Sequence, residues 1–328
     1  MRAPGFWSAD PGVLAGLLTP ASWIWARITA RRVSRPGTNV GVPVICIGNL
    51  TAGGTGKTPV VIAVLEALVE QGVAGAHALS RGYGGTLAGP VRVEAARHTA
   101  AEVGDEPLLL SAYAPTWVCR NRLTGAAAAV AAGAKVIVMD DGFQNPDLAK
   151  TLTLLVIDAE AGFGNGHVIP AGPLREPVLA GLARADLLVL LGPDQARESF
   201  VRGTPAVADL PLVEGTLSPL QTGMPWAGLR CFAFAGIGRP DKFFATLRMT
   251  GAEVVEVRSF PDHAPYPPAL ARRLLSDAQK SNAQLVTTEK DAVRLPPDIR
   301  RQVLTLPVRV KLTDAAPLLD RLRDVYQV

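Results

Sequence analysis

The chain has 328 residues, of which 48% are hydrophobic and only 5% aromatic, and this length predicts two domains with separate cores. Its three cysteines lie far apart and form no Cys-x-x-Cys pair, which argues against disulfides and zinc and for a reducing compartment. The composition is typical of a cytosolic α/β protein, and we expect no nucleic-acid partner.

The net charge of +4 is concentrated at the N-terminus, where residues 1–40 hold five arginines and one aspartate. Residues 11–26 are uncharged and include Trp23 and Trp25, but Pro20 interrupts them and they are too short for a good membrane span. A secretory signal begins with its positive charges, whereas here the charges follow the apolar run. The pattern suits an interfacial anchor on an anionic membrane face. A helix packed on the protein's own core is the open alternative.

A glycine-rich loop at residues 48–58 follows an apolar stretch at 42–47 and precedes a helical pattern. Strand, glycine loop, Gly-Lys-Thr and helix is the order that a phosphate-binding P-loop requires, because its backbone N–H groups and the helix start face a polyphosphate. We expect Lys57 to reach the β- and γ-phosphates of ATP and Thr58 to hold Mg²⁺. The strict motif has glycine in place of Thr51, so the loop is a variant. The predicted nucleotide-binding residues are Thr51, Ala52, Gly53, Gly54, Thr55, Gly56, Lys57 and Thr58.

Strand and helix patterns alternate through the first two hundred residues, as in a mostly parallel sheet with helices on both faces. Candidate strands are 42–47, 75–80, 115–119, 135–139, 152–158 and 186–191, and candidate helices are 57–71, 105–113, 122–133 and 178–184. The pattern loosens at 212–228 into Gly, Pro, Ser and Thr. A second alternation of strands and helices follows, with strands 230–235, 253–258, 284–287 and 303–311 and helices 240–249 and 268–280.

We therefore predict an α/β fold with a P-loop kinase-like, mostly parallel sheet and a smaller C-terminal α/β domain. Residues 1–40 form the membrane-associating helix region of the N-terminal domain. Residues 41–222 form the catalytic, nucleotide-binding domain, and residues 223–328 form the smaller domain that closes over the site.

Two carboxylates, Asp140 and Asp141, end an apolar run at 135–139. In P-loop proteins a carboxylate at the tip of a neighbouring strand belongs to the Mg²⁺ shell. Alone, the pair would be explained equally well by a turn. With Lys57 and Thr58 nearby in the same fold, both aspartates are predicted as metal ligands.

Other polar segments have a structural as well as a functional interpretation. Asp105 lies where acidic residues commonly cap a helix. Arg81 and Tyr83 follow a strand, at the ligand-binding edge of the sheet or in a plain turn. Arg175 lies in a long loop and could meet a phosphate. His263, after a strand of the second domain, is either a surface residue or a group that approaches the nucleotide when the domains close.

The ordered set of motifs resembles the tetraacyldisaccharide 4′-kinase family, the lipid A 4′-kinases of Gram-negative bacteria. The motifs that carry the resemblance are Gly48-Asn49-Leu50, Gly53-Gly54-Thr55-Gly56-Lys57-Thr58-Pro59, Ser80-Arg81-Gly82-Tyr83-Gly84, Gly104-Asp105-Glu106, Asp140-Asp141-Gly142-Phe143-Gln144, Pro170-Ala171-Gly172-Pro173-Leu174-Arg175-Glu176, Phe260-Pro261-Asp262-His263 and Thr288-Glu289-Lys290-Asp291-Ala292. The family's loop resembles Thr51 and the double glycine here, so the variant P-loop is consistent with it.

The resemblance implies ATP-dependent phosphorylation of the 4′-hydroxyl of a tetraacylated glucosamine disaccharide 1-phosphate, giving lipid IVA in lipopolysaccharide biosynthesis. It implies that Asp105 takes the hydroxyl proton with His263 as its partner, that Lys57 is catalytic, and that Asp140 and Asp141 bind the metal. Whether Asp105 or Asp141 is nearer the acceptor stays open. The candidate substrate-binding residues are Arg81, Tyr83, Arg122, Gln144, Arg175 and Glu176.

The resemblance also implies a peripheral protein on the cytoplasmic face of the inner membrane, and we expect a monomer. Two other classes stay open on the residues alone. A membrane-associated P-loop switch fits the loop and the basic N-terminus, although no Asn-Lys-x-Asp guanine motif is present. A soluble kinase or ligase fits the P-loop and the aspartates but leaves the tryptophans and the arginine cluster unexplained.

Overall fold

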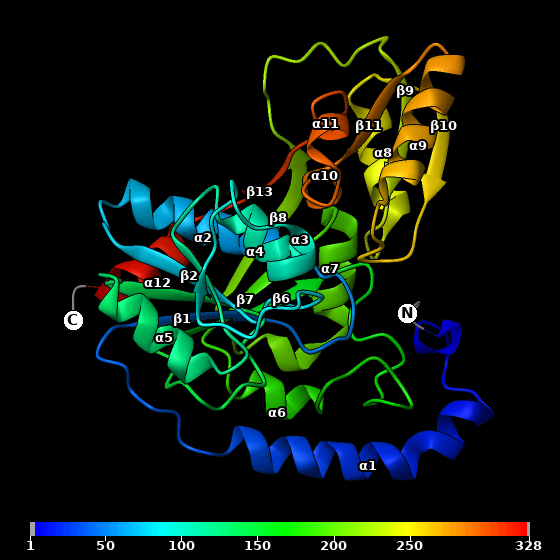
Figure 1. The fold of residues 1–328 in the computed structure, drawn as a ribbon. Coiled ribbons are helices and arrows are strands. Elements are labelled where there is room, and N and C mark those ends of the chain that lie inside the picture. The colour runs from blue at the N-terminus through cyan, green and yellow to red at the C-terminus, as the bar shows by residue number, and fades with distance from the viewer. Residues whose placement is uncertain (1–3, 327–328) are drawn as a thin grey trace.

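The computed structural model describes residues 4–326 and contains a nine-stranded and a four-stranded sheet. Figure 1 shows the larger sheet in the body of the molecule and the smaller sheet at the top, with the two chain ends on the larger unit. The predicted fold class, an α/β protein with a mostly parallel sheet and a smaller C-terminal α/β unit, is confirmed.

The larger sheet is parallel except at its two edges. In spatial order its strands are β13 (Val308–Leu312), β8 (Leu212–Pro219), β7 (Leu187–Leu191), β6 (Leu152–Asp158), β1 (Val44–Gly48), β5 (Val136–Asp140), β2 (Ala76–Ser80), β4 (Thr116–Val118) and β3 (Val91–Arg92). Only β13 and β3 run antiparallel to their neighbours. All seven residues of β6 are buried, as expected for an apolar strand covered on both faces.

Helices cover both faces of this sheet, and each face has its own core. On one face lie α2 (Lys57–Glu70), α4 (Asp105–Leu110) and α12 (Ala316–Tyr326). On the other lie α5 (Arg122–Ala131), α6 (Val178–Leu182) and α7 (Asp194–Gly203). The short elements are η1 (Gly5–Trp7), α3 (Ala100–Val103) and η2 (Pro205–Val207). Because the central strands are parallel, their carboxyl ends meet at one edge, where ligands bind in such folds.

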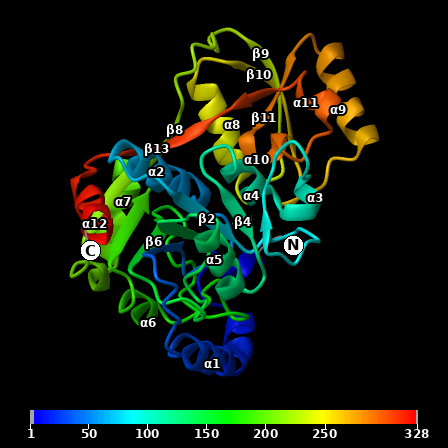
Figure 2. The ribbon, with the colours of Figure 1, turned by 60° about the vertical axis from the view of Figure 1, so that its left-hand side comes forward.

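The smaller sheet is parallel throughout and packs between helices of its own. Its strands, in spatial order, are β10 (Glu253–Ser259), β9 (Arg230–Ala235), β11 (Gln284–Thr288) and β12 (Leu304–Leu306). Its helices are α8 (Pro240–Met249), α9 (Pro268–Lys280), α10 (Glu289–Ala292) and α11 (Pro297–Arg300). One apolar core lies under α8 and another under α9. In Figure 2 this unit sits over one end of the larger sheet, with α10 close to α4.

The single strand predicted at 303–311 is wrong, because Pro307 divides it into strands of different sheets. β12 pairs with β11, whereas β13 pairs with β8. Proline has no N–H for a strand ladder, so the break falls at this residue. The carbonyl of Pro307 accepts from the N–H of Leu220 at 2.9 Å. Residues 308–326 therefore pack with the larger unit, whereas the sequence analysis placed them in the smaller one.

Part of the segment 212–228, predicted to be irregular, is the strand β8. Its first five residues alternate between partly buried and buried positions, but Gly215, Thr216, Ser218 and Pro219 make its sequence a poor strand signal. The segment rich in Gly, Pro, Ser and Thr that follows β8 connects the two sheets.

The N-terminal helix α1 (Val13–Val33) lies along the base of the larger unit, on the side opposite the smaller sheet (Figure 1). It buries Ala15, Ser22 and Thr29, which are small or polar and recur every seven residues. Its large apolar side chains face outward instead, with Leu17 73% and Trp23 67% exposed. Within residues 4–326 no helix is long and apolar enough to span a membrane.

Candidate active site

The P-loop connects β1 to α2 at the edge where the parallel strands end. β1 ends at Gly48 and α2 begins at Lys57, with Gly56 as its N-cap. Gly53 and Gly56 have φ angles of 124° and 85°, a region that glycine adopts readily and other residues rarely do. The backbone can therefore turn its N–H groups toward a ligand at the start of α2, which suits a polyphosphate.

Lys57 is held at this loop by polar groups from two strand ends. Its Nζ donates to Oδ1 of Asn49 at 3.2 Å and lies 3.6 Å from Oδ1 of Asp141. In the same loop, the buried Oγ1 of Thr55 has no hydrogen-bond partner among the described residues. Buried hydroxyl groups are normally satisfied, so this oxygen is available to a ligand of the loop.

Asp140 and Asp141 lie beside the P-loop because β5 is the neighbour of β1. Asp140 pairs with Ile47 in the register of these strands, and Asp141 follows with a left-handed φ of 50°. Burial, with the nearby charges of Glu106 and Asp141, raises the pKa of Asp140 to about 7. Burial also opposes the charge of Asp141, but Lys57 and an arginine, Arg175, lower its pKa to about 2.

These residues fit a magnesium ion on the chemistry of their oxygen atoms. Asp140 is only 4% exposed, and its carboxylate makes no hydrogen bond or ion pair within residues 4–326. A buried carboxylate without a donor or cation is costly, and a hard divalent cation would compensate it. Asp140, Asp141 and the hydroxyl of Thr58 at the start of α2 are the groups that could hold the ion.

The loop at residues 164–177 is joined to the P-loop by backbone and side-chain bonds. The N–H of Ala52 donates to the carbonyl of Pro173 at 2.8 Å, and the N–H of Arg175 donates to the carbonyl of Leu50 at 2.7 Å. The Arg175 guanidinium contacts Asp141 at 2.8 Å. The sequence-predicted Arg175 therefore lies within the group formed by Lys57 and Asp141.

Gln144 and Glu176 form a buried link below this group. Nε2 of Gln144 donates to the carbonyl of Asn49 at 3.0 Å and to Oε1 of Glu176 at 3.0 Å, and Oε2 of Glu176 pairs with Arg184. Both side chains are nearly inaccessible, at 8% and 2% exposed. Their contacts hold the P-loop against the 164–177 loop, so in this arrangement both residues support the site.

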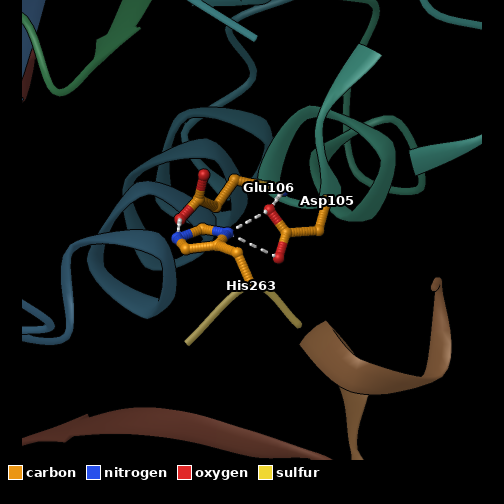
Figure 3. Close-up of side chains that lie close together, drawn as sticks. All are labelled: Asp105, Glu106 and His263. Atoms are coloured by element: carbon orange, nitrogen blue, oxygen red, sulfur yellow. Dashed lines mark hydrogen bonds and ion pairs between the residues drawn. The ribbon is translucent and has the colours of Figure 1, made fainter. Parts of the chain in front are cut away.

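Asp105 and His263, 158 residues apart in the chain, are brought together from the two units. Figure 3 shows the imidazole facing the carboxylate, with Nδ1 3.1 Å from Oδ1 and 3.0 Å from Oδ2. His263 has a left-handed φ of 58°, a strained conformation that is common at functional sites. Burial opposes the charge of Asp105, but the bond from His263 and the charge of Lys290 lower its pKa.

Two further basic residues of the smaller unit approach Asp105, and the sequence analysis did not predict them as site residues. Lys290, on α10, contacts Oε1 of Glu106 at 2.8 Å. Arg294, one turn later, has Nε 3.5 Å from Oδ2 of Asp105. In the sequence, Lys290 was marked only by its place in a motif at the end of a strand, and nothing marked Arg294 as a site residue.

A separate contact between the units, also missed, centres on Asp158. This residue ends β6 and is only 6% exposed. Arg239 and Lys242, at the start of α8, approach its carboxylate at 2.6 and 2.8 Å, and Lys242 also pairs with Glu160. Burial opposes the charge of Asp158, but these two cations lower its pKa.

The remaining predicted substrate residues occupy different positions around the same edge. Arg122 is 3% exposed and donates from Nη1 to the carbonyl of Cys119 at 2.8 Å, while its Nε has no partner among the described residues. Tyr83 is 67% exposed, and its ring stacks edge-on against His263 with centroids 5.3 Å apart. Arg81, two residues before Tyr83, is also exposed.

Comparison with known proteins gives one consistent result. The family model described as tetraacyldisaccharide-1-P 4′-kinase matches residues 14–327. A protein of Dinoroseobacter shibae named tetraacyldisaccharide 4′-kinase is 58% identical over 323 residues, covering 97% of this chain and 96% of the relative. A protein of the same name from Jannaschia sp. is 54% identical, with 97% of each chain covered. Among solved structures, LpxK from Aquifex aeolicus, described as an apo form in complex with ATP, matches with a TM-score of 0.76 and 27% identity, covering 96% of this chain and all of that one.

Proposed function

Because the chain belongs to the tetraacyldisaccharide-1-phosphate 4′-kinase family, we infer that it is a kinase of lipid A biosynthesis. It transfers the γ-phosphoryl group of ATP to the 4′-hydroxyl of a tetraacylated glucosamine disaccharide 1-phosphate, and the product is lipid IVA. The observation that carries this function is the position of a buried, hydrogen-bonded carboxylate, Asp105, at the same sheet edge as the P-loop.

We propose that ATP binds with its phosphates along Thr51 to Thr58. The backbone N–H groups of the loop surround the phosphates, and Lys57 reaches the β- and γ-phosphates. The contact between Lys57 and Asp141 at 3.6 Å supports this role, because a carboxylate keeps the ammonium at the loop before the nucleotide arrives. Positioning and charge stabilisation of this kind supply most of the rate enhancement in phosphoryl transfer.

We propose Thr58, Asp140 and Asp141 as the residues that hold Mg²⁺. The uncompensated, buried carboxylate of Asp140 supports this assignment. When bound, the ion neutralises charge that develops on the β- and γ-phosphates.

We propose that Asp105 accepts the proton of the 4′-hydroxyl as the phosphoryl group arrives. A sugar hydroxyl has a pKa far above 7, so it needs a carboxylate within hydrogen-bond reach. The pKa of Asp105 lies below its ordinary value, so the group is ionised and ready to accept. His263 orients this carboxylate from the other unit through its Nδ1.

Substrate contacts are proposed around this carboxylate and the P-loop. Arg81 and Arg122 are candidates for the anionic groups of the sugar phosphate, and Tyr83 covers the imidazole of His263. Arg175 lies close enough to Asp141 to meet a phosphate of ATP. Gln144 and Glu176 act by holding the loop that carries Arg175.

We propose that α1 binds the cytoplasmic face of the inner membrane as a peripheral anchor, and that the protein acts as a monomer. The support is the outward orientation of its apolar side chains, among them Leu17, Trp23 and Ile24, next to an arginine-rich segment that ends the helix. In this arrangement the acyl chains remain partly in the bilayer while the sugar enters the space between the units.

The test is transfer of labelled γ-phosphate from Mg·ATP to tetraacyldisaccharide 1-phosphate in detergent micelles. We expect the wild type to label the lipid, and Asp105→Asn to lower kcat by roughly 10²–10⁴-fold with little change in KM for ATP. Asp298→Asn, at an exposed position on α11, is the matched control and should keep wild-type activity. ATP hydrolysis without label in the lipid would favour a P-loop switch. Lipid labelling that persists in Asp105→Asn would support the proposed reaction but refute the role of Asp105 as the base.

A further inference from the structure

The imidazole of His263 is enclosed by charged side chains from both units. Asp105 and Glu106 face it from α4, Asp262 from its own loop and Lys290 from α10, and Arg294 lies behind Asp105. The ring of Tyr83 covers one side. Figure 3 shows Asp105 on the Nδ1 side of the ring and Glu106 on the Nε2 side.

Hydrogen atoms can be assigned to this ring from its two neighbours. An ionised carboxylate only accepts, so Nδ1, which lies 3.0 and 3.1 Å from the oxygens of Asp105, carries a hydrogen. A lysine ammonium only donates, so Nε2, which lies 3.3 Å from Nζ of Lys290, accepts. The ammonium therefore favours a neutral imidazole with its proton on Nδ1, against the carboxylates of Asp262 and Glu106, which lie 3.7 and 4.0 Å from Nε2.

We propose that Lys290 is a positioning residue of the phosphoryl-transfer site, favouring the neutral form of His263, whose Nδ1–H is aimed at Asp105. This inference rests on the proposed function, in which Asp105 accepts the hydroxyl proton. A neutral N–H fixes the carboxylate in place. An imidazolium would bind the same oxygens more strongly and make Asp105 a weaker base.

The ionisation of Lys290 is secured by the carboxylates that it contacts. Its Nζ lies 2.8 Å from Glu106 and 3.7 Å from Asp262. Burial opposes the positive charge, but Glu106, Asp105 and Asp262 raise the pKa of Lys290 above its ordinary value. The lysine therefore stays an ammonium through the pH range in which His263 titrates.

The same ammonium also explains why two carboxylates and an imidazole can lie so close together. One ligand atom from each of Asp105, Glu106 and His263 falls within 4.8 Å of the others, a grouping that would suit a metal ion. Lys290 supplies positive charge to this cluster by donating to Glu106 and approaching Nε2, and Arg294 lies 3.5 Å from Asp105.

The opposing effects on His263 give the inference a measurable consequence. The hydrogen bond to Asp105 raises the pKa of His263 above its ordinary value, and burial and the charge of Lys290 limit this rise. Removal of Lys290 should therefore raise the pKa of His263 further. If neutral His263 is the active form, the rate of phosphoryl transfer rises with pH as the imidazolium loses its proton. Removal of Lys290 should move this acidic limb of the pH–rate profile to higher pH.

The experiment follows His263 directly in the full-length protein and measures activity in parallel. Histidine side chains are labelled for NMR, and the His263 signal among the four histidines is assigned with His263→Asn. In Lys290→Met we expect the pKa of His263 to rise by about one unit. At pH values below both pKa values, kcat should fall about tenfold, since the neutral fraction falls by that factor, and it should recover as the pH rises.

Two variants control for loss of packing. Lys290→Arg keeps the charge and should leave the titration of His263 close to wild type. Lys280→Met removes an exposed lysine of α9 (75% exposed) and should change neither readout. An unchanged titration of His263 in Lys290→Met, or a rise in KM alone, would overturn the inference. A wild type that does not phosphorylate the lipid would refute the proposed function instead, and the titration would still decide the role of Lys290 at His263.

Discussion

Asp140 and Asp141 are consecutive residues with opposite electrostatic surroundings. Burial and two neighbouring acids raise the pKa of Asp140, whereas Lys57 and Arg175 lower that of Asp141, whose side chain is 39% exposed. Among residues 4–326 the first carboxylate forms no ion pair, while the second pairs with two cations. At the scale of single residues, Asp140 is the group that gains most from a bound divalent ion.

We expect Asp140→Asn to weaken Mg²⁺ binding and to lower kcat roughly 10²-fold or more, because the ion loses its most buried ligand. The measurement is phosphoryl transfer as a function of Mg²⁺ concentration, with Asp298→Asn as control. EDTA should abolish activity in every active variant, and added Mg²⁺ should restore it. An Asp140→Asn enzyme with a wild-type Mg²⁺ dependence would exclude Asp140 as a ligand.

At the scale of elements, α1 has the reverse of the usual amphipathic arrangement. Globular proteins bury the apolar stripe of a surface helix, whereas α1 buries small and polar residues. Ser22 bonds the carbonyl of Val168 at 2.7 Å, and Nε1 of Trp25 donates to the carbonyl of Arg175 at 3.1 Å. The helix is thus attached to the same 164–177 loop that contacts the P-loop.

We expect the double variant Leu17→Glu/Ile24→Glu to bind anionic vesicles at least about tenfold more weakly, because each exposed apolar side chain contributes about 1.5–3 kcal/mol when buried in lipid. Cosedimentation with phosphatidylglycerol-containing vesicles measures this. Met249→Glu, at an apolar position of the smaller unit that is 84% exposed, is the control and should bind like wild type. Since Leu17 and Ile24 face outward, the unfolding temperature should not change. Equal vesicle binding by all three proteins would contradict the anchor.

At the scale of the whole molecule, polar contacts hold the two units against each other. One group joins Asp105 and Glu106 to His263, Lys290 and Arg294, and a second joins Asp158 to Arg239 and Lys242. The second group includes no proposed catalytic residue. It therefore allows the contact between the units to be weakened without altering the proposed reacting groups.

We expect Asp158→Asn to shift the molecule toward a more open arrangement at pH 7, by about 1 kcal/mol because the two cations are partly exposed. Arg239 and Lys242 lower the pKa of Asp158, so the contribution is complete above the ordinary pKa of the group and is lost as the pH falls through the lowered value. The variant should therefore show its whole effect at neutral pH. Distances between spin labels on the two units measure it. Identical distance distributions in Asp158→Asn and wild type would refute this role.

The features that could be predicted from the sequence are those that one continuous segment of the chain determines. The P-loop is continuous, and Asp140 follows an apolar strand, so both were assigned from their neighbours in the chain. The pairing of Asp105 with His263 came only from the family resemblance, because it depends on how two separate sheets pack. Lys290 and Arg294 were missed for the same reason.

The wrong or undecided predictions of whole elements also arise because packing between distant segments is not visible in the sequence. Residues 303–311 look like one apolar strand, and although Pro307 indicates a break in the run, it does not show that the two halves join different sheets. The sequence left two interpretations of α1 open, because composition does not say which side of a helix faces the protein. The burial of Ala15, Ser22 and Thr29 and the contacts of Ser22 and Trp25 with the 164–177 loop define that side.

The division of one strand run between two sheets has a mechanical consequence. The chain passes between the units twice, after β8 and at Pro307, and the bond from Leu220 to Pro307 ties these crossings together. Because the two crossings lie side by side, any relative motion of the units would bend the chain at this one place. Such a motion would move His263, Lys290 and Arg239 away from their partners together, because all three lie on the smaller unit.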